Sequence, residues 1–362
     1  MSFRRIFLSF CTILLLAGNL TTQALALEEG LQIRITQVDN SHFPKVTVYI
    51  SVTSANREPA GVEASQIQLY EDGVLIQPEK VLGAGETGPL TTLLVMDVSG
   101  SMANGGKLET AKVAASAYVA QMRPTDKTGL ISYNTQVTIA QPITSDRLKL
   151  DDAIESLNAK GDTAMYDALL KAVAILSGET GRKAIIVLTD GLDNRSTARA
   201  KDVAAAVGPG GVSISTIGLG DPAASVTNDG LDEAGLRSLA KAAGGLYSYA
   251  ADSATLQTIY ESYGRALHSE YAITYTSPSA LRDGVNRNLS VSVGEAGMEA
   301  DTAYNPGGVL PEVASKNWPL FGGVLAGLVG LAFLPGIIDQ VKVSSERNSR
   351  NEIKKRSRIK LK

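Results

Sequence analysis

Leu93-Leu94-Val95-Met96-Asp97-Val98-Ser99-Gly100-Ser101-Met102 is the stretch that decides the fold of this chain of 362 residues. Its first four residues are all apolar, which is typical of a central strand that is buried on both faces of a sheet. Three oxygen-bearing side chains follow at once, on Asp97, Ser99 and Ser101. We therefore expect them at the carboxyl edge of an α/β sheet, where such proteins bind ligands.

Two later segments add further oxygen donors in similar positions. Gly161-Asp162-Thr163 supplies the Thr163 hydroxyl, and Val187-Leu188-Thr189-Asp190-Gly191 supplies the Asp190 carboxylate after another apolar run. Carboxylates and hydroxyls suit a hard divalent cation, Mg²⁺ first, with Mn²⁺ or Ca²⁺ also possible. Five such groups leave a coordination position for water or for a partner's carboxylate. A lone Asp-x-Ser-x-Ser is often an ordinary strand-to-helix turn, so the prediction depends on all three segments together.

The three segments together resemble the metal-ion-dependent adhesion site of von Willebrand factor type A domains, over residues 89–268. The resemblance implies that Ser99 and Ser101 bind the metal directly and that Thr163 binds it directly or through water. It implies that Asp97 and Asp190 act mainly through waters, or as acceptors behind the ligands. All five residues of the pattern are present. The neighbouring Asp162 and Asp193 are interpreted as solvated loop charges.

Between and after these segments, helical and strand-like patterns alternate, which predicts a doubly wound, mostly parallel sheet. The expected strands are 93–96, 128–133, 183–188, 212–217 and 245–249, and the expected helices are 107–122, 148–157, 163–176, 198–207, 231–243 and 253–267.

The segments on either side of this domain alternate apolar and polar residues, as antiparallel strands do. Residues 27–88 include a hairpin with an Asp72-Gly73 turn, and residues 269–304 repeat the alternation. Neither segment has many strands, so we expect the two to join into one β-sandwich. The predicted fold class is therefore α/β, a Rossmann-like sheet inserted in or flanked by a β-sandwich module, plus one transmembrane helix.

The amino-terminal residues 1–26 have the pattern of a secretory signal peptide. Two arginines precede an apolar stretch, and Ala24-Leu25-Ala26 is a small-x-small cleavage site. Arg4-Arg5 is also compatible with twin-arginine export, so the general and twin-arginine routes both stay open. The single cysteine, Cys11, would leave with the signal peptide, and the mature chain would then contain no disulfide.

Residues 318–338 form an uncharged apolar stretch, long enough to span a membrane. Residues 305–317 are the expected linker, and residues 339–362 contain nine Lys or Arg against three Asp or Glu. This basic tail predicts a single-pass membrane protein with the tail in the cytoplasm and the folded domains outside. The lack of disulfides and the compact signal peptide favour a bacterial cell membrane, and a eukaryotic secretory route is the alternative. Gly323 and Gly327 match a small-xxx-small dimer pattern, although glycine is common in such spans. The basic tail would serve as a plain topology anchor or contact anionic lipid head groups.

Charge narrows the possible partners. The formal net charge is −3; without the two arginines of the signal peptide and the six excess positive charges of the tail, residues 27–338 have −11. An acidic exterior disfavours nucleic acid and leaves a protein or glycan ligand that presents a carboxylate to the metal.

A catalytic role is not expected from the residues available. The chain has two histidines, His42 and His268, in different modules, and no cysteine after maturation, so a nucleophile and base are hard to assemble. The sequence therefore predicts a divalent-cation-dependent binding or adhesion protein and no enzyme. Two alternatives stay open: an assembly or accessory subunit of an envelope machine such as a pilus or secretion apparatus, and a purely structural metal.

Overall fold

A computed structural model of the chain describes residues 31–54, 58–220, 230–294, 298–308, 319 and 321–331. The chain divides into two compact units, Met1–Pro311 and Glu312–Lys362. The expected signal peptide and basic tail lie outside the described residues.

The first unit contains a six-stranded sheet with the strand order β11-β10-β9-β6-β7-β8. Its strands are β6 (Leu90–Asp97), β7 (Lys127–Tyr133), β8 (Val137–Thr144), β9 (Arg182–Thr189), β10 (Ser213–Leu219) and β11 (Gly244–Ala250). Neighbouring strands are parallel except for the edge strand β8, which is antiparallel to β7. The mostly parallel sheet predicted from the alternation is therefore confirmed.

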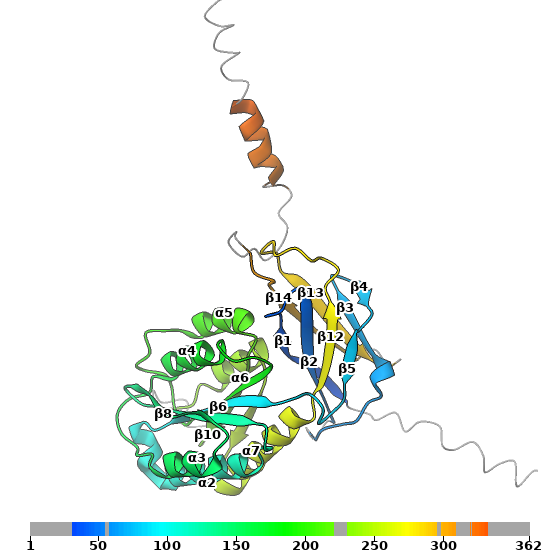
Figure 1. Cartoon of the computed structure of the whole chain (residues 1–362). Helices are drawn as coiled ribbons and strands as arrows, with labels where there is room; N and C mark the ends of the chain where they lie inside the picture. Colours follow the sequence, from blue (N-terminus) through cyan, green and yellow to red (C-terminus); the bar gives the residue numbers. More distant parts are fainter. Residues whose placement is uncertain are drawn as a thin grey trace, which may run out of the picture. The chain divides into compact units, whose positions relative to one another are not determined.

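Helices cover both faces of this sheet (Figure 1). They are α2 (Lys107–Ala120), α3 (Arg147–Glu155), α4 (Met165–Leu176), α5 (Ala200–Gly210), α6 (Glu233–Ala242) and α7 (Ser253–His268). Along β6, Leu94 and Met96 pack in the cluster with α2, α3 and α7. Leu93 and Val95 pack in the cluster with α4, α5 and α6. The uninterrupted apolar run of β6 is thus explained by burial on both faces.

The helix that follows Thr163 begins two residues later than expected. Ala164 precedes α4 with φ −111° and ψ 63°, which is outside the helical region. Thr163 therefore lies in the loop that precedes α4, and not in the helix. The strand β8 was not predicted, and a 3₁₀ segment, η2 (Gly100–Gly106), precedes α2.

The other described strands of the first unit form two four-stranded antiparallel sheets, ordered β1-β2-β12-β5 and β14-β13-β3-β4. We refer to them as the two-sheet module. Its strands are β1 (Gln32–Asp39), β2 (Lys45–Thr53), β3 (Ile67–Glu71), β4 (Val74–Ile76), β5 (Lys80–Leu82), β12 (Tyr271–Thr276), β13 (Arg287–Val293) and β14 (Met298–Tyr304), with a 3₁₀ turn, η1 (Ala64–Gln66), before β3.

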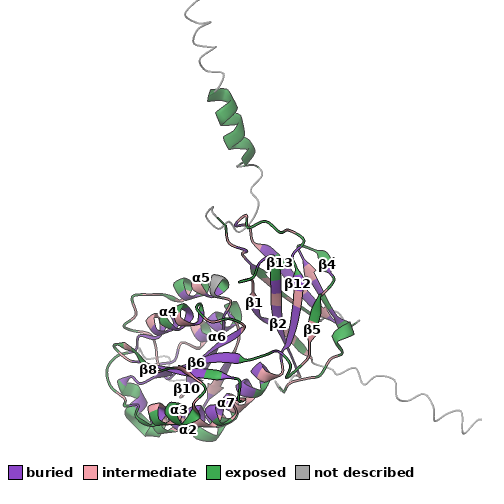
Figure 2. Cartoon of the chain, viewed as in Figure 1, coloured by how far each residue is buried: buried purple, intermediate pink, exposed green. Residues whose placement is uncertain are grey.

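Strands from both sides of the α/β domain pair within the two-sheet module. β2 pairs with β12, and β3 pairs with β13. The apolar residues of both sheets contribute to one buried cluster, visible in purple along β2 and β12 in Figure 2. The predicted Asp72-Gly73 turn joins β3 and β4 with positive φ at both residues, 48° and 79°, as a type I′ hairpin requires.

In the second unit, residues 321–331 form a helix that includes Gly323 and Gly327. Most of the expected membrane span, 318–338, lies outside the described residues. Within the described part of the chain, no helix is both long and apolar enough to cross a bilayer.

Candidate functional site

The central strand β6 delivers Asp97 to the carboxyl edge of the sheet, where its side chain is buried. The chain then turns sharply, and the backbone N–H of Ser99 donates to Asp97 Oδ1 at 2.8 Å. The hydroxyl of Thr189, at the end of the adjacent β9, donates to Asp97 Oδ2 at 2.7 Å. The Asp97 carboxylate is thereby held in one orientation, with one oxygen bonded by the turn after β6 and the other by the end of β9.

Three of the predicted residues form a continuous chain of oxygens. The hydroxyls of Ser99 and Ser101 share a hydrogen bond of 3.0 Å. The Ser101 hydroxyl donates to Asp190 Oδ1 at 2.7 Å. Ser99 and Asp190 are buried, whereas Ser101 is exposed. The group is therefore rooted in the protein and open to solvent on one side.

Thr163 reaches the same edge through its loop. The backbone N–H of Gly100 donates to the carbonyl of Gly161 at 2.8 Å. The backbone N–H of Lys160 donates to the carbonyl of Val98, also at 2.8 Å. The loop of Thr163 is thus tied to the Ser99 turn, while the described hydrogen bonds do not join the Thr163 hydroxyl to the other four residues.

A second set of bonds ties the Thr163 loop to the segment after Asp190. Asn194 Oδ1 accepts from the Thr163 N–H at 2.9 Å, and the Asn194 N–H donates to the Thr163 carbonyl at 3.1 Å. Asp193, expected to be a solvated loop charge, accepts from the Tyr166 N–H and from both the N–H and the hydroxyl of Ser196. Asp193 is therefore a structural acceptor that fixes this loop.

The electrostatics of the site are dominated by burial. Desolvation raises the pKa of Asp97 to about 6, against the hydrogen bonds from Ser99 and Thr189, which lower it. A cation close to this edge would stabilise the charged carboxylate. The arrangement therefore favours binding of positive charge.

One cationic side chain lies at the site and was not predicted from the sequence. Lys107, the first residue of α2, places its Nζ 2.6 Å from Asp190 Oδ2. No local pattern marks a lysine at this position, since only the folded chain brings residues 107 and 190 together. Thr189 was likewise missed as the partner of Asp97, although it directly precedes the predicted Asp190.

The donor set fits a hard divalent cation. Neighbouring ligands of an octahedral Mg²⁺, at bond lengths of 2.0–2.1 Å, lie about 2.9 Å apart. The steps of 3.0 Å and 2.7 Å from Ser99 through Ser101 to Asp190 are close to that spacing. In the described part of the chain, no cluster of three or more His, Cys, Asp or Glu could hold a metal. Any site on this edge therefore depends on hydroxyls together with its two carboxylates.

Comparison with known proteins gives a family for this part of the chain. The family model described as von Willebrand factor type A domain matches residues 92–192. A curated relative, the UPF0353 protein of Mycolicibacterium paratuberculosis, is 29% identical over 202 residues, which are 49% of this chain and 60% of the relative. The chain thus spans less than two thirds of that relative's length.

Two solved structures are similar in part. An aerotolerance-related membrane protein from Bacteroides fragilis is 25% identical, with a TM-score of 0.43, over 49% of this chain and 98% of that one. The proximal thread matrix protein 1 of the mussel byssus, solved with a zinc-occupied metal-ion-dependent adhesion motif, is 19% identical, with a TM-score of 0.45, over 54% of this chain and 49% of that one. The family model covers all five predicted residues, and residues 92–192 therefore belong to a von Willebrand factor type A domain.

Proposed function

We propose that this chain is a divalent-cation-dependent binding protein whose ligand is a protein or glycan that presents a carboxylate. The observation that carries the proposal is the chain of oxygens from Ser99 through Ser101 to Asp190, at spacings of 3.0 Å and 2.7 Å. This group stands at the carboxyl edge of the central strand, where α/β proteins bind ligands.

In this proposal, Ser99, Ser101 and Thr163 would hold the cation, with Asp97 and Asp190 as carboxylate partners, directly or through water. Mg²⁺ is the expected ion, and Mn²⁺ or Ca²⁺ would satisfy the same oxygen donors. When bound, the ion would supply positive charge for an incoming carboxylate. Ser101 leaves the site open because it is exposed, while buried Asp97 and Thr189 orient the turn from below.

A binding role is preferred to catalysis because no histidine among the described residues lies at the site, and the two carboxylates there, Asp97 and Asp190, are assigned to the cation. His268 lies at the end of α7 and bonds Asp126, which directly precedes β7. That is the amino-terminal edge of the parallel sheet, whereas Asp97 ends β6 at the carboxyl edge. Among the described residues, the hydroxyls at the site therefore have no histidine to activate them.

The wider setting is also proposed. Residues 1–26 would direct export, residues 318–338 would anchor the chain, and residues 339–362 would remain in the cytoplasm, which leaves the binding site outside. The two-sheet module would be a β-sandwich that carries the cation domain. Gly323 and Gly327, which share one helix, would allow pairing of two anchors.

A second candidate function is assembly. The basic tail and the apolar segment would then contact other membrane subunits of an envelope machine, such as a pilus or secretion apparatus, and the cation domain would be an accessory. Crosslinking in the membrane discriminates between the two: partners lost on removal of residues 339–362 but kept in Asp190→Asn favour assembly.

The binding proposal is tested with immobilised peptides that end in glutamate, beside matched peptides that end in glutamine. We expect the full-length chain to bind the glutamate peptides in Mg²⁺ and to release them in chelator. Asp190→Asn should abolish this binding. Binding that persists in chelator, or that does not distinguish glutamate from glutamine, would contradict the proposal.

A further inference from the structure

Lys107 is a cationic side chain that contacts one of the two carboxylates of the candidate cation site. Its Nζ lies 2.6 Å from Asp190 Oδ2, while the other oxygen of the same carboxylate accepts from Ser101. One carboxylate therefore bonds the ammonium and the hydroxyl chain at once. A divalent cation held by Ser99 and Ser101 would stand within reach of this ammonium, and like charges repel strongly at such distances.

The place of Lys107 in the helix supports a specific role. It is the first residue of α2, where the positive end of the helix dipole disfavours a cation. Its Nζ also lies 3.7 Å from the position that a Cβ on Gly220 would take, so the side chain extends across the sheet edge toward the end of β10. The pairing with Asp190 therefore accounts for a charge that local helix energetics oppose.

The side chain of Lys107 is able to leave. It is 31% exposed, whereas the side chain of Asp190 is fully buried. A lysine has a flexible four-carbon stem, and its strongly hydrated ammonium moves into water readily. The carboxylate, in contrast, is fixed. A cation that arrives from solvent can therefore displace the ammonium without any backbone change.

We propose that Lys107 is a tethered competitor of the metal: it neutralises Asp190 when no divalent cation is bound and is displaced when one binds. This inference rests on the proposed metal site. It implies that the site binds divalent cations more weakly than it would without the charge of Lys107. It also implies that metal binding releases a free ammonium at the rim, beside the position where a ligand's carboxylate would arrive.

The test is a calorimetric titration of Mg²⁺ into the full-length chain and into Lys107→Met, which keeps an unbranched side chain one atom shorter and removes the charge. Lys171→Met, an exposed lysine on α4, is the matched control for loss of one positive charge. We expect Lys107→Met to bind Mg²⁺ about tenfold more tightly than wild type, within the range usual for coupled binding events. Lys171→Met should bind as wild type does.

Thermal unfolding supplies a readout that does not depend on ligand binding. In chelator, Lys107→Met should melt at a lower temperature than wild type, because buried Asp190 loses its counter-charge; saturating Mg²⁺ should close that gap. Equal affinities in wild type and Lys107→Met, or weaker binding in the variant, would overturn the inference and leave the proposed function intact. Absence of Mg²⁺ binding in both proteins would overturn the inference together with the proposed function.

Discussion

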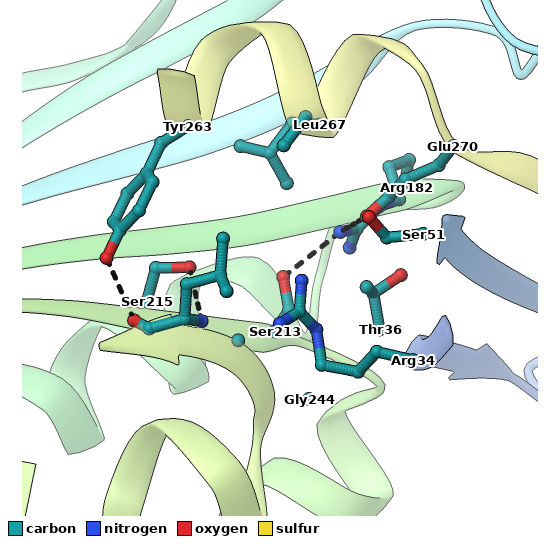
Figure 3. A pocket seen from close by; sticks show the side chains of 13 residues that line it. Arg34, Thr36, Ser51, Arg182, Ser213, Ser215, Gly244, Tyr263, Leu267 and Glu270 are labelled. Atoms are coloured by element: carbon teal, nitrogen blue, oxygen red, sulfur yellow. Dashed lines mark hydrogen bonds and ion pairs between the residues drawn. The ribbon is translucent and has the colours of Figure 1, made fainter. Parts of the chain in front are cut away.

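Arg182 and Glu270 form a fully buried ion pair at the junction between the α/β domain and the two-sheet module, with both side chains 1% exposed. Arg182 begins β9 of the large sheet, and Glu270 directly precedes β12. Arg182 Nη2 donates to Glu270 Oε1 at 2.7 Å, and its Nε donates to Oε2. The pair lies beside a small cavity of about 20 Å³. Figure 3 shows Arg182 and Glu270 among the side chains that line it.

A strand of the two-sheet module completes this contact. Gln37, on β1, accepts from Arg182 Nη1 at 2.7 Å and from the Lys183 N–H at 2.8 Å, and donates to the Gly181 carbonyl at 2.8 Å. The guanidinium is therefore satisfied by groups from both modules. Because this network lies at the start of β9 and Asp190 follows its end, the junction and the cation site are at opposite edges of one sheet.

Breaking this pair should be costly. Removing one partner leaves a buried charge without compensation, so we expect Arg182→Met or Glu270→Gln to lower the free energy of unfolding by about 3–5 kcal/mol. The double variant Arg182→Met/Glu270→Leu should recover much of the loss, since an apolar pair needs no counter-charge. Urea denaturation measures all three.

The matched control is an exposed ion pair that joins the same two modules. Arg265 Nη2 lies 3.2 Å from Glu58 Oε1, with side chains 43% and 58% exposed. We expect Glu58→Gln to change the free energy of unfolding by less than about 1 kcal/mol. Similar losses for Glu58→Gln and Glu270→Gln would show that burial does not set the strength of these pairs.

Asp126 makes the stability depend on acid pH. Burial raises its pKa, but hydrogen bonds from His268, from the Leu90 N–H and from Arg123 outweigh burial and hold the pKa well below the usual range. A depressed carboxyl pKa contributes stability that is present above the unfolded-state pKa, near 4, and is lost as the pH falls below it.

We therefore expect Asp126→Asn to lower the free energy of unfolding by about 2 kcal/mol at pH 7. The difference from wild type should shrink as the pH is lowered from 5 towards 2, because the Asp126 carboxyl then binds a proton in the unfolded chain while it stays charged in the folded one. Urea midpoints across this range test the sign. A difference that is constant with pH would refute the electrostatic explanation.

Much of the α/β domain could be predicted because its signals are local. Uninterrupted apolar runs marked the central strands, and helical spacing marked all six helices. The edge strand β8 was missed because its residues are half-exposed or exposed and include Pro142, so it lacks both the apolar run and the regular alternation of a strand. Similarly, β5 has only three residues, too few to show a period.

The candidate site could be predicted in part for the same reason. Asp97, Ser99 and Ser101 lie within five residues of one another in the sequence, and Asp190 directly follows β9, a strand that pairs with β6. Lys107 could not be found, since its role depends on a side chain that reaches across the sheet edge. Metal binding by the five residues stays a prediction, and so do the signal peptide, the membrane span and the basic tail.

In the two-sheet module, Glu71 is a buried carboxylate that binds three side chains from two segments, the end of β12 and the end of β14. It accepts from Tyr275 at 2.6 Å, from Ser277 at 2.6 Å and from Tyr304 at 3.1 Å. We expect Tyr275→Phe to lower the free energy of unfolding by about 2–3 kcal/mol, because a buried charged acceptor loses a donor.

Tyr70, on the same strand β3 as Glu71, is the control. Its hydroxyl makes an exposed bond of 2.8 Å to Gln68, so Tyr70→Phe should change the free energy of unfolding by less than about 0.5 kcal/mol. If Tyr275→Phe proved as mild as Tyr70→Phe in urea denaturation, the Glu71 network would not be what joins the strands before and after the α/β domain.

The central claim is tested most directly by calorimetric titration of Mg²⁺ into the full-length chain, Ser101→Ala and the exposed control Ser156→Ala. Ser101 links Ser99 to Asp190 and is exposed, so its hydroxyl can be removed with little effect on folding. We predict that wild type and Ser156→Ala bind Mg²⁺ alike, and that Ser101→Ala binds at least about tenfold more weakly, a loss of about 1.4 kcal/mol. Equal Mg²⁺ affinity in Ser101→Ala and wild type, or no binding in wild type, would contradict the proposed cation site.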